Sequence, residues 1–169
     1  MRFSPTLLLL SLTTLATAAI WPQSFWASTH QIGGSGGTPF TLVAEYGTYV
    51  QRIRFCWNDN YLRGIRLTYR NGVQVVTGRE EGSCNSYTLN EAKTELIRSM
   101  TLWGDGKGSK AGRVKFVTSL GVTYDVGKKD TNGQESFQMD VGSGVLLGFI
   151  GRSGLDIDKL SPVFLRSGL

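Results

Sequence analysis

The stretch YVQRIRFCW, from Tyr49 to Trp57, alternates apolar and polar side chains and places Ile53 and Phe55 on one face. A period of two sends successive side chains to opposite faces of an extended chain and is typical of a half-buried β-strand. The stretch from Ile65 to Tyr69 repeats the pattern, and Asn71-Gly72 follows it as a hairpin signal. These residues predict paired antiparallel strands.

The same pattern continues along the chain at short intervals. Further candidate strands begin at residue 73 and cover 86–89, 97–103, 113–118, 122–126, 137–139, 145–150 and 160–166, whereas 90–94 is expected to be a turn. The chain has 169 residues, of which 40% are apolar and 18% charged, with 22 glycines. This composition predicts one all-β domain, because the chain is too apolar for disorder and too short for a second catalytic domain.

The N-terminus has the features of an export signal. Arg2 supplies a positive charge, Leu7 to Leu15 is uncharged, and Ala16-Thr17-Ala18 offers a small-residue cleavage site. Residues 1–18 are therefore predicted to be a signal peptide, and the mature protein to be secreted and extracellular. A membrane anchor is the alternative, but the apolar run is shorter than the roughly 20 residues that span a bilayer, so no membrane span is expected. Residues 19–32 are read as an N-terminal arm or a first strand, with a short propeptide as a further alternative.

Charge and cysteine content limit the expected partners. The formal net charge is +5, and the basic residues alternate with apolar ones, which indicates a solvated sheet face and no nucleic-acid partner. Cys56 and Cys84 are expected to form a disulfide in an oxidising compartment, with two buried thiols as the alternative. His30 is the single histidine and no Cys-x-x-Cys pair exists, so neither a metal site nor a cofactor is expected.

Three glycine-rich segments carry a family resemblance. They are Gly33–Gly37, followed by Phe40; Gly104–Gly112; and a closing segment, Gly148–Gly154, whose Gly-Arg-Ser-Gly is followed by a Gly-x-x-x-Asp spacing that ends at Asp158. In this order, from about Gly33 to Leu165, the sequence resembles the jacalin-related lectins. Its sequence motifs are also similar to those of the lectin half of fish aerolysin-like proteins.

The resemblance implies a fold and a site. The fold would be a β-prism I, with three four-stranded antiparallel sheets around a pseudo-threefold axis, and residues 33–169 would form one jacalin-like lectin domain. The site would lie between the first glycine-rich loop and the loop before the last strand. The implied carbohydrate-binding residues are Gly37, Gly154, Leu155, Asp156 and Asp158, with secondary contacts from Gly36, Asp105 and Lys107. Gly37 would leave space, Leu155 and Asp156 would present backbone N–H groups, and Asp158 would accept from two neighbouring hydroxyls.

The resemblance also implies a sugar preference. Gly37 lies well inside the chain, and Leu155 and Asp156 follow Gly154 where the galactose-binding branch has aromatic residues. Mannose- or glucose-containing glycans are therefore the expected partners, bound without a metal. The binding would be non-catalytic, because Asp156 and Asp158 are too close on one loop for the opposed carboxyls of a glycoside hydrolase. A homo-oligomer is one expected form, since shallow sugar sites are weak. The alternative is a non-catalytic interaction protein on the same fold that binds a protein or membrane partner.

Overall fold

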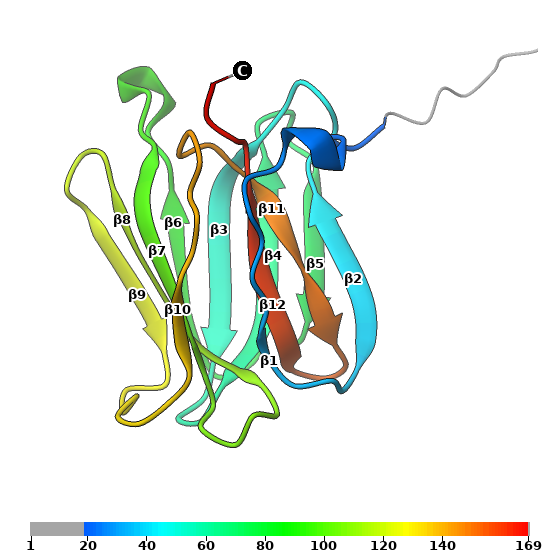
Figure 1. Ribbon diagram of the computed structural model, residues 1–169, viewed down its shortest axis with the longest axis vertical. Coiled ribbons are helices and arrows are strands. Elements are labelled where there is room, and N and C mark those ends of the chain that lie inside the picture. The colour runs from blue at the N-terminus through cyan, green and yellow to red at the C-terminus, as the bar shows by residue number, and fades with distance from the viewer. Residues whose placement is uncertain (1–18, 169) are drawn as a thin grey trace, which may run out of the picture.

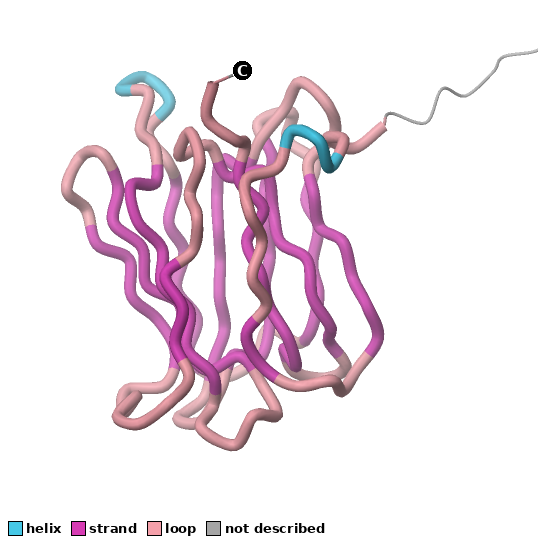
Figure 2. Tube along the Cα trace, in the orientation of Figure 1, coloured by secondary structure: helices cyan, strands magenta, loops and turns pink. Residues whose placement is uncertain are grey.

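The computed structural model describes residues 19–168, so the predicted signal peptide lies outside the described residues. The described chain is built from strands and two short 3₁₀ turns, η1 (Gln23–Phe25) and η2 (Glu91–Lys93), as Figure 2 shows. The strands are β1 (Ile32–Gly33), β2 (Thr38–Val43), β3 (Val50–Trp57), β4 (Leu62–Tyr69), β5 (Gln74–Gly78), β6 (Ser83–Thr88), β7 (Ile97–Gly104), β8 (Ala111–Thr118), β9 (Thr123–Gly127), β10 (Ser136–Gln138), β11 (Leu146–Ser153) and β12 (Ile157–Phe164). Within residues 19–168, no helix has the length and apolar character needed to cross a membrane.

The strands form three four-stranded antiparallel sheets. Their orders are β1-β12-β11-β2, β10-β7-β8-β9 and β5-β4-β3-β6, and Figure 1 shows them standing side by side around a shared interior. The chain starts and ends in the same sheet, because β1 pairs with β12. The predicted all-β class and the β-prism architecture are thereby confirmed.

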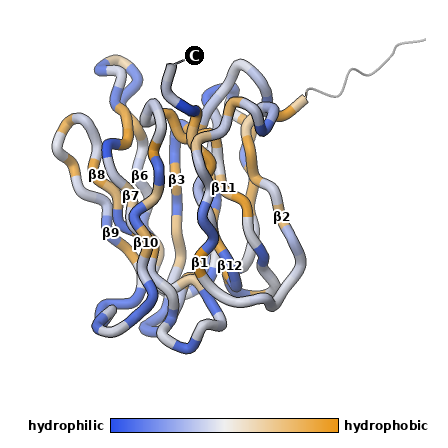
Figure 3. The backbone as a smooth tube through the Cα atoms, in the orientation of Figure 1, coloured by the Kyte–Doolittle hydropathy of each residue, from blue (hydrophilic) through white to orange (hydrophobic). Residues whose placement is uncertain are grey.

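One phenylalanine from each sheet fills the common core. Phe55 on β3, Phe116 on β8 and Phe149 on β11 are fully buried. The rings of Phe55 and Phe149 meet edge to face with their centroids 5.6 Å apart, and Tyr124 stacks on Phe116 at 4.9 Å. Figure 3 shows hydrophobic and hydrophilic residues alternating along the strands, as a sheet with one buried face requires. The alternation read from the sequence therefore marks the residues that join the three sheets.

The segment before β1 packs onto the outer face of the first sheet. Trp21 and Trp26 cover a small apolar cluster formed by Val43, Leu147 and Val163, which point away from the main core. Trp26 also forms an isolated bridge with Leu165. The segment before β1 thus packs against the first sheet, and Ile32 enters β1.

The last two strands differ from the sequence expectation. β11 extends to Ser153, because Arg152 and Ser153 pair with Pro39 and Thr38 of β2 although they are polar. β12 begins at Ile157, so Asp158 lies in the last strand and not in the loop before it. Apolar alternation alone could not place these polar ends.

Pro162 lies in an interior strand, although proline lacks a ladder donor and is typical of edge strands. β12 lies between β1 and β11, and Pro162 pairs with Phe149 of β11. Proline is tolerated there because β1 pairs only with Lys159 and Leu160 and stops before it reaches Pro162.

A disulfide joins two directly paired residues of the third sheet. Cys56 on β3 and Cys84 on β6 are cross-strand neighbours, with a sequence separation of 28 residues. Closing a loop of this length stabilises the fold by about 3 to 4 kcal/mol in the chain-entropy model. In urea unfolding, we expect the Cys56→Ser/Cys84→Ser protein to lose most of this free energy. Reduced wild-type protein should have the same free energy of unfolding as the double variant. Equal midpoints for oxidised protein, reduced protein and the double variant would show that the bridge contributes nothing.

Candidate functional site

Three loops meet at one end of the prism, the lower end in Figure 1. They are the β1–β2 loop (34–37), the β7–β8 loop (105–110) and the β11–β12 bend (154–156). The N–H of Gly34 donates to the carbonyl of Asp158 at 2.8 Å. A Cβ on Gly34 would lie 2.5 Å from the carbonyl oxygen of Ser109, so only glycine lets the first loop pass between β12 and the β7–β8 loop.

Bare backbone surrounds the Asp158 carboxylate. A Cβ on Gly37 would lie 2.5 Å from Oδ2 of Asp158, and one on Gly36 would lie 2.9 Å from Oδ1. Gly37 has a φ of +64°, a left-handed conformation that favours glycine. A Cβ on Gly154 would be 3.9 Å from Oδ2 and 4.0 Å from the Cα of Gly37. Segments separated by more than a hundred residues thus converge on one carboxylate.

Lys110 is the cationic partner of Asp158. Its Nζ donates to Oδ1 of Asp158 at 2.8 Å and lies 5.3 Å from the ring centre of Tyr61. Burial alone would lower the pKa of the Lys110 ammonium, but the bond to Asp158 and the charges of Asp158 and Asp156 hold that pKa above its usual value. Oδ1 is therefore engaged, and Oδ2 faces the glycines. Sequence reasoning missed Lys110, whose only signal was its place at the end of the glycine-rich β7–β8 loop.

The Asp156 carboxylate holds the bend in place. Its Oδ1 accepts from Nε and an NH2 group of Arg79, each at 3.1 Å, and lies 3.4 Å from Nε of Arg63. Its Oδ2 lies 3.8 Å from Nζ of Lys110. The side chain therefore points into the protein, whereas neighbouring Leu155 is 72% exposed at the tip of the bend. Within residues 19–168, the N–H groups of Leu155 and Asp156 have no hydrogen-bond partner, so the bend keeps two unused donors.

Arg152 fixes the first loop from the other side. Its Nε donates to the carbonyl of Gly36 at 2.8 Å, and one NH2 group donates to the carbonyl of Gly37 at 2.7 Å. The two carbonyls point toward Arg152, and the glycine Cα atoms are left facing Asp158. The Gly-Arg-Ser-Gly motif could be read from the sequence, but this positioning contact could not.

The two β7–β8 loop residues that were expected to make secondary contacts are placed differently. Oδ1 of Asp105 accepts from the backbone N–H of Lys107 at 2.9 Å and of Ser109 at 3.2 Å, and Oδ2 accepts from the Ser109 hydroxyl at 2.5 Å. Both oxygens of the Asp105 carboxylate are therefore engaged by donors of its own loop, and this carboxylate organises the loop. The Lys107 side chain is exposed. Within residues 19–168, no three histidine, cysteine or acidic side chains gather as a metal site.

Asp105 gives the stability of this loop a pH dependence. Burial alone would raise the pKa of Asp105, but bonds from Ser109 and from the backbone of Lys107 and Ser109 hold it below the ordinary value. A carboxyl with a lowered pKa stabilises the fold at neutral pH and loses that contribution as pH falls through the folded-state pKa. Asp105→Asn should cost about 1 kcal/mol of unfolding free energy at pH 7.

The difference in unfolding free energy between wild type and Asp105→Asn should disappear below about pH 4. Urea unfolding measured from pH 7 to pH 2 checks this. Asp59→Asn, a change at an exposed position, serves as the control and should follow wild type throughout. A constant gap across the whole pH range would contradict the assignment.

Comparison with known proteins decides the family. A family model described as a jacalin-like lectin domain matches residues 29–162. This chain belongs to the jacalin-like lectin domain family. The matched residues include all three loops of the site, and within this jacalin-like domain Gly37, Lys110 and Asp158 come from three separate loops or strands.

Individual relatives support the same assignment. Jacalin-related lectin 40 of Arabidopsis thaliana is 28% identical over 165 residues, which cover 90% of this chain and 34% of that protein. The lamprey immune protein has a TM-score of 0.77 at 30% identity, over 82% of this chain and 44% of that one. A mannose-binding lectin from champedak has a TM-score of 0.63 at 20% identity, over 80% of this chain and 94% of that one, which supports the fold alone. The chain thus spans about a third of the plant relative and less than half of the lamprey protein.

Proposed function

We propose that this jacalin-like protein is a secreted carbohydrate-binding protein that recognises mannose- or glucose-type glycans through a metal-free site. The observation that carries the proposal is the position of the Asp158 carboxylate. Its Oδ2 lies against the bare backbone of Gly37 and Gly154, where any side chain on Gly37 would collide with it. The hydroxyl groups of a sugar ring can approach such a carboxylate closely, because the neighbouring glycines have no side chains in the way.

The site offers both acceptors and donors at fixed positions. A hexose is a rigid polyol, so two neighbouring hydroxyls can donate together to Asp158, each bond contributing up to about 1.5 to 3 kcal/mol. The free N–H groups of Leu155 and Asp156 can donate to sugar oxygens. Lys110 can donate to the same ring, because its Nζ is already 2.8 Å from Oδ1 of Asp158.

The loops around Asp158 are held before any ligand arrives. Arg152 fixes the carbonyls of Gly36 and Gly37, and Arg79 fixes Asp156 beneath the bend. Ordering these loops therefore costs little on binding, which favours recognition of a small neutral ligand. The site is nonetheless shallow and competes with water, so a single site should bind a monosaccharide with a dissociation constant on the order of 0.1 to 1 mM. Several sites in one assembly, or a multivalent glycan, would then supply useful avidity.

The preference for mannose or glucose has two supports. Leu155 and Asp156 follow Gly154 in place of aromatic residues, and Gly37 contributes a peptide group inside the chain and not a free amino terminus. The champedak protein of the same fold is a mannose-binding lectin by name. Secretion is supported by the sequence of residues 1–18 and by the Cys56–Cys84 disulfide. Lectins bind sugars without converting them, and the protein is accordingly non-catalytic.

A glycan array with free-sugar competition tests the function. We expect signals on mannose- or glucose-terminated glycans that methyl α-mannoside removes and methyl α-galactoside leaves in place. Signals removed only by the galactoside would overturn the sugar preference. Binding that ignores both sugars and falls with salt would favour the alternative, an interaction protein that uses its basic faces.

Gly37→Ala tests the bare backbone directly. The new Cβ would stand 2.5 Å from Oδ2 of Asp158 and 2.5 Å from the carbonyl carbon of Ser153, so the loop must shift and mannoside affinity should fall at least about tenfold. The left-handed φ should add about 1 to 2 kcal/mol of strain. Gly133→Ala is the matched control, because Gly133 has a φ of +68° with nothing within 4 Å of its Cβ position. Gly133→Ala should therefore show the backbone strain and keep the wild-type affinity for mannoside. Equal mannoside affinities for Gly37→Ala and Gly133→Ala in calorimetry would contradict the role of Gly37.

A further inference from the structure

The outer face of the β5-β4-β3-β6 sheet carries an arginine cluster that the loop site does not use. Arg52 and Arg54 lie on β3, and Arg66 lies on β4 directly opposite Arg54. Together with Thr68, Gln74 and Glu80, these arginines line a depression of about 330 Å³. We call this group of six residues the arginine depression.

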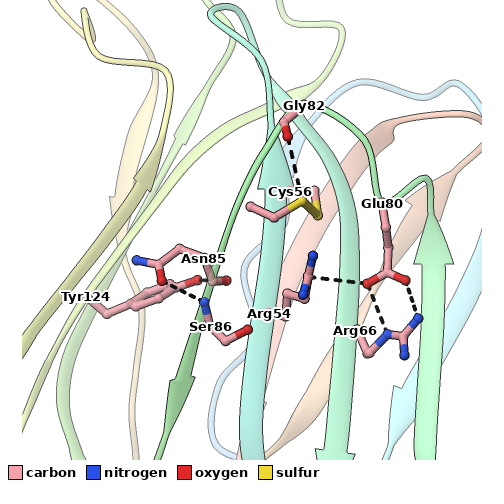
Figure 4. The surroundings of a disulfide bond; sticks show 9 residues. Arg54, Cys56, Arg66, Glu80, Gly82, Asn85, Ser86 and Tyr124 are labelled. Carbon is pink, nitrogen blue, oxygen red and sulfur yellow. Dashed lines mark hydrogen bonds and ion pairs between the residues drawn. A yellow bond between two sulfur atoms is a disulfide. The ribbon is translucent and has the colours of Figure 1, made fainter.

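One carboxylate, that of Glu80, lies against two of the three guanidinium groups there. Glu80 accepts from Arg66, with Oε1 at 3.0 Å from its Nε, and the same Oε1 lies 3.6 Å from Nε of Arg54. Figure 4 shows Arg54 and Arg66 on either side of Glu80. The Nε atom of Arg54 is shielded from solvent and has no hydrogen-bond partner, and Arg52 has no acidic partner within residues 19–168. The depression therefore carries two uncompensated positive charges.

Glu80 offsets only part of the positive charge of the three arginines. Like charges directly opposite on neighbouring strands repel each other, as Arg54 and Arg66 do. The remaining walls, Thr68 and Gln74, are neutral hydrogen-bonding side chains, and no aliphatic or aromatic residue lines the depression. A doubly charged, oxygen-rich group would match both the charge and the lining.

The depression is also rigid. Arg54 is two residues from Cys56, whose disulfide to Cys84 ties β3 to β6, as Figure 4 shows. The Nε and one terminal nitrogen of Arg66 are held by Glu80, and another terminal nitrogen donates to Gln74 at 3.2 Å. Arg66 held in this way keeps its remaining N–H donors in fixed positions, and a planar guanidinium suits tetrahedral oxyanions better than a flexible lysine does.

We propose that the arginine depression binds the sulfate or phosphate ester groups of acidic glycans. A tetrahedral dianion can place separate oxygens against Arg52, Arg54 and Arg66 and neutralise the two excess charges. The proposal does not depend on the sugar site, because none of the six lining residues belongs to the three loops around Asp158.

NMR of the arginine Nε–H signals provides the test. Inorganic sulfate and inorganic phosphate are titrated against chloride at constant ionic strength, followed by a sulfated heparin disaccharide and mannose 6-phosphate, each compared with its ester-free form. We expect saturable shifts of Arg52, Arg54 and Arg66 with the ester-bearing ligands and none with chloride or the ester-free sugars. A response to only one of the two esters identifies which ester the depression takes.

Variants that remove a positive or a negative charge test whether the anion binds in the arginine depression. Arg52→Gln should weaken binding of the disaccharide about tenfold, whereas Glu80→Gln, which removes the competing carboxylate, should strengthen it several-fold. Arg98→Gln removes an equal charge from an exposed position on β7 and should change nothing, and Asp158→Asn should leave this binding intact even if it abolishes mannoside binding. Equal losses in Arg52→Gln and Arg98→Gln, or shifts that chloride reproduces, would overturn the proposal.

Discussion

Asp158→Asn is expected to reduce mannoside affinity at least about 100-fold, which places the dissociation constant beyond the range of calorimetry. The change removes the charge from both oxygens that hydroxyls would share, so two charge-assisted bonds of about 1.5 to 3 kcal/mol each are weakened or lost. An amide nitrogen in place of Oδ2 would also point a donor at the sugar's own donors. The binding loss should appear in both calorimetry and the glycan array.

The stability control separates binding from folding. Asp158 also pairs with Lys110, so the variant loses one partly buried ion pair. Asp125→Asn breaks a comparable pair with Arg113, which joins β9 to β8 and includes no residue of the three loops. Both variants should melt within a few degrees of each other, and only Asp158→Asn should lose the mannoside. Retained affinity in Asp158→Asn would remove Asp158 from the site.

The largest effect on stability is expected from Phe149→Ala. Phe149 is fully buried on β11 and meets Phe55 of another sheet with ring centroids 5.6 Å apart. Truncation should cost about 3 to 5 kcal/mol, because the cavity opens where rigid sheets cannot easily close on it. The loss should be visible as a lower urea midpoint with an unchanged slope.

Phe137→Ala provides the matched comparison. Phe137 lies on β10, is 41% exposed and stacks on His30 at 3.8 Å, so its truncation should cost about 1 kcal/mol or less. Similar midpoints for the two variants would mean that the three sheets do not share the core described above. Because Phe149 lies on the strand that leads to the Gly154 bend, Phe149→Ala should also weaken mannoside binding when measured near its melting temperature.

The sequence predicted the strands better than their ends. Apolar alternation located β3, β4 and β8 because one face of each is buried. It could not place the ends of β11 and β12, where polar residues continue the ladder and the backbone, not the side-chain pattern, decides the boundary.

The site was predicted in part, for a similar reason. Positive φ and close backbone approach require glycine, so Gly37 left a visible mark in the sequence. The roles of Lys110 and Arg152 depend on contacts across 48 and 116 residues, which no local pattern encodes. Asp105 was expected near the ligand because of its loop, but its hydrogen bonds to that loop's own backbone could be seen only in three dimensions.

The most direct measurement is a crystal structure of the protein with methyl α-mannoside. We predict a sugar ring between the Gly36–Gly37 loop and the Gly154 bend, with two hydroxyl oxygens within about 3 Å of the Asp158 carboxylate and others facing the N–H groups of Leu155 and Asp156. A mannoside bound on another surface, or no sugar beside Asp158 at saturating mannoside with these loops open to solvent, would contradict this account.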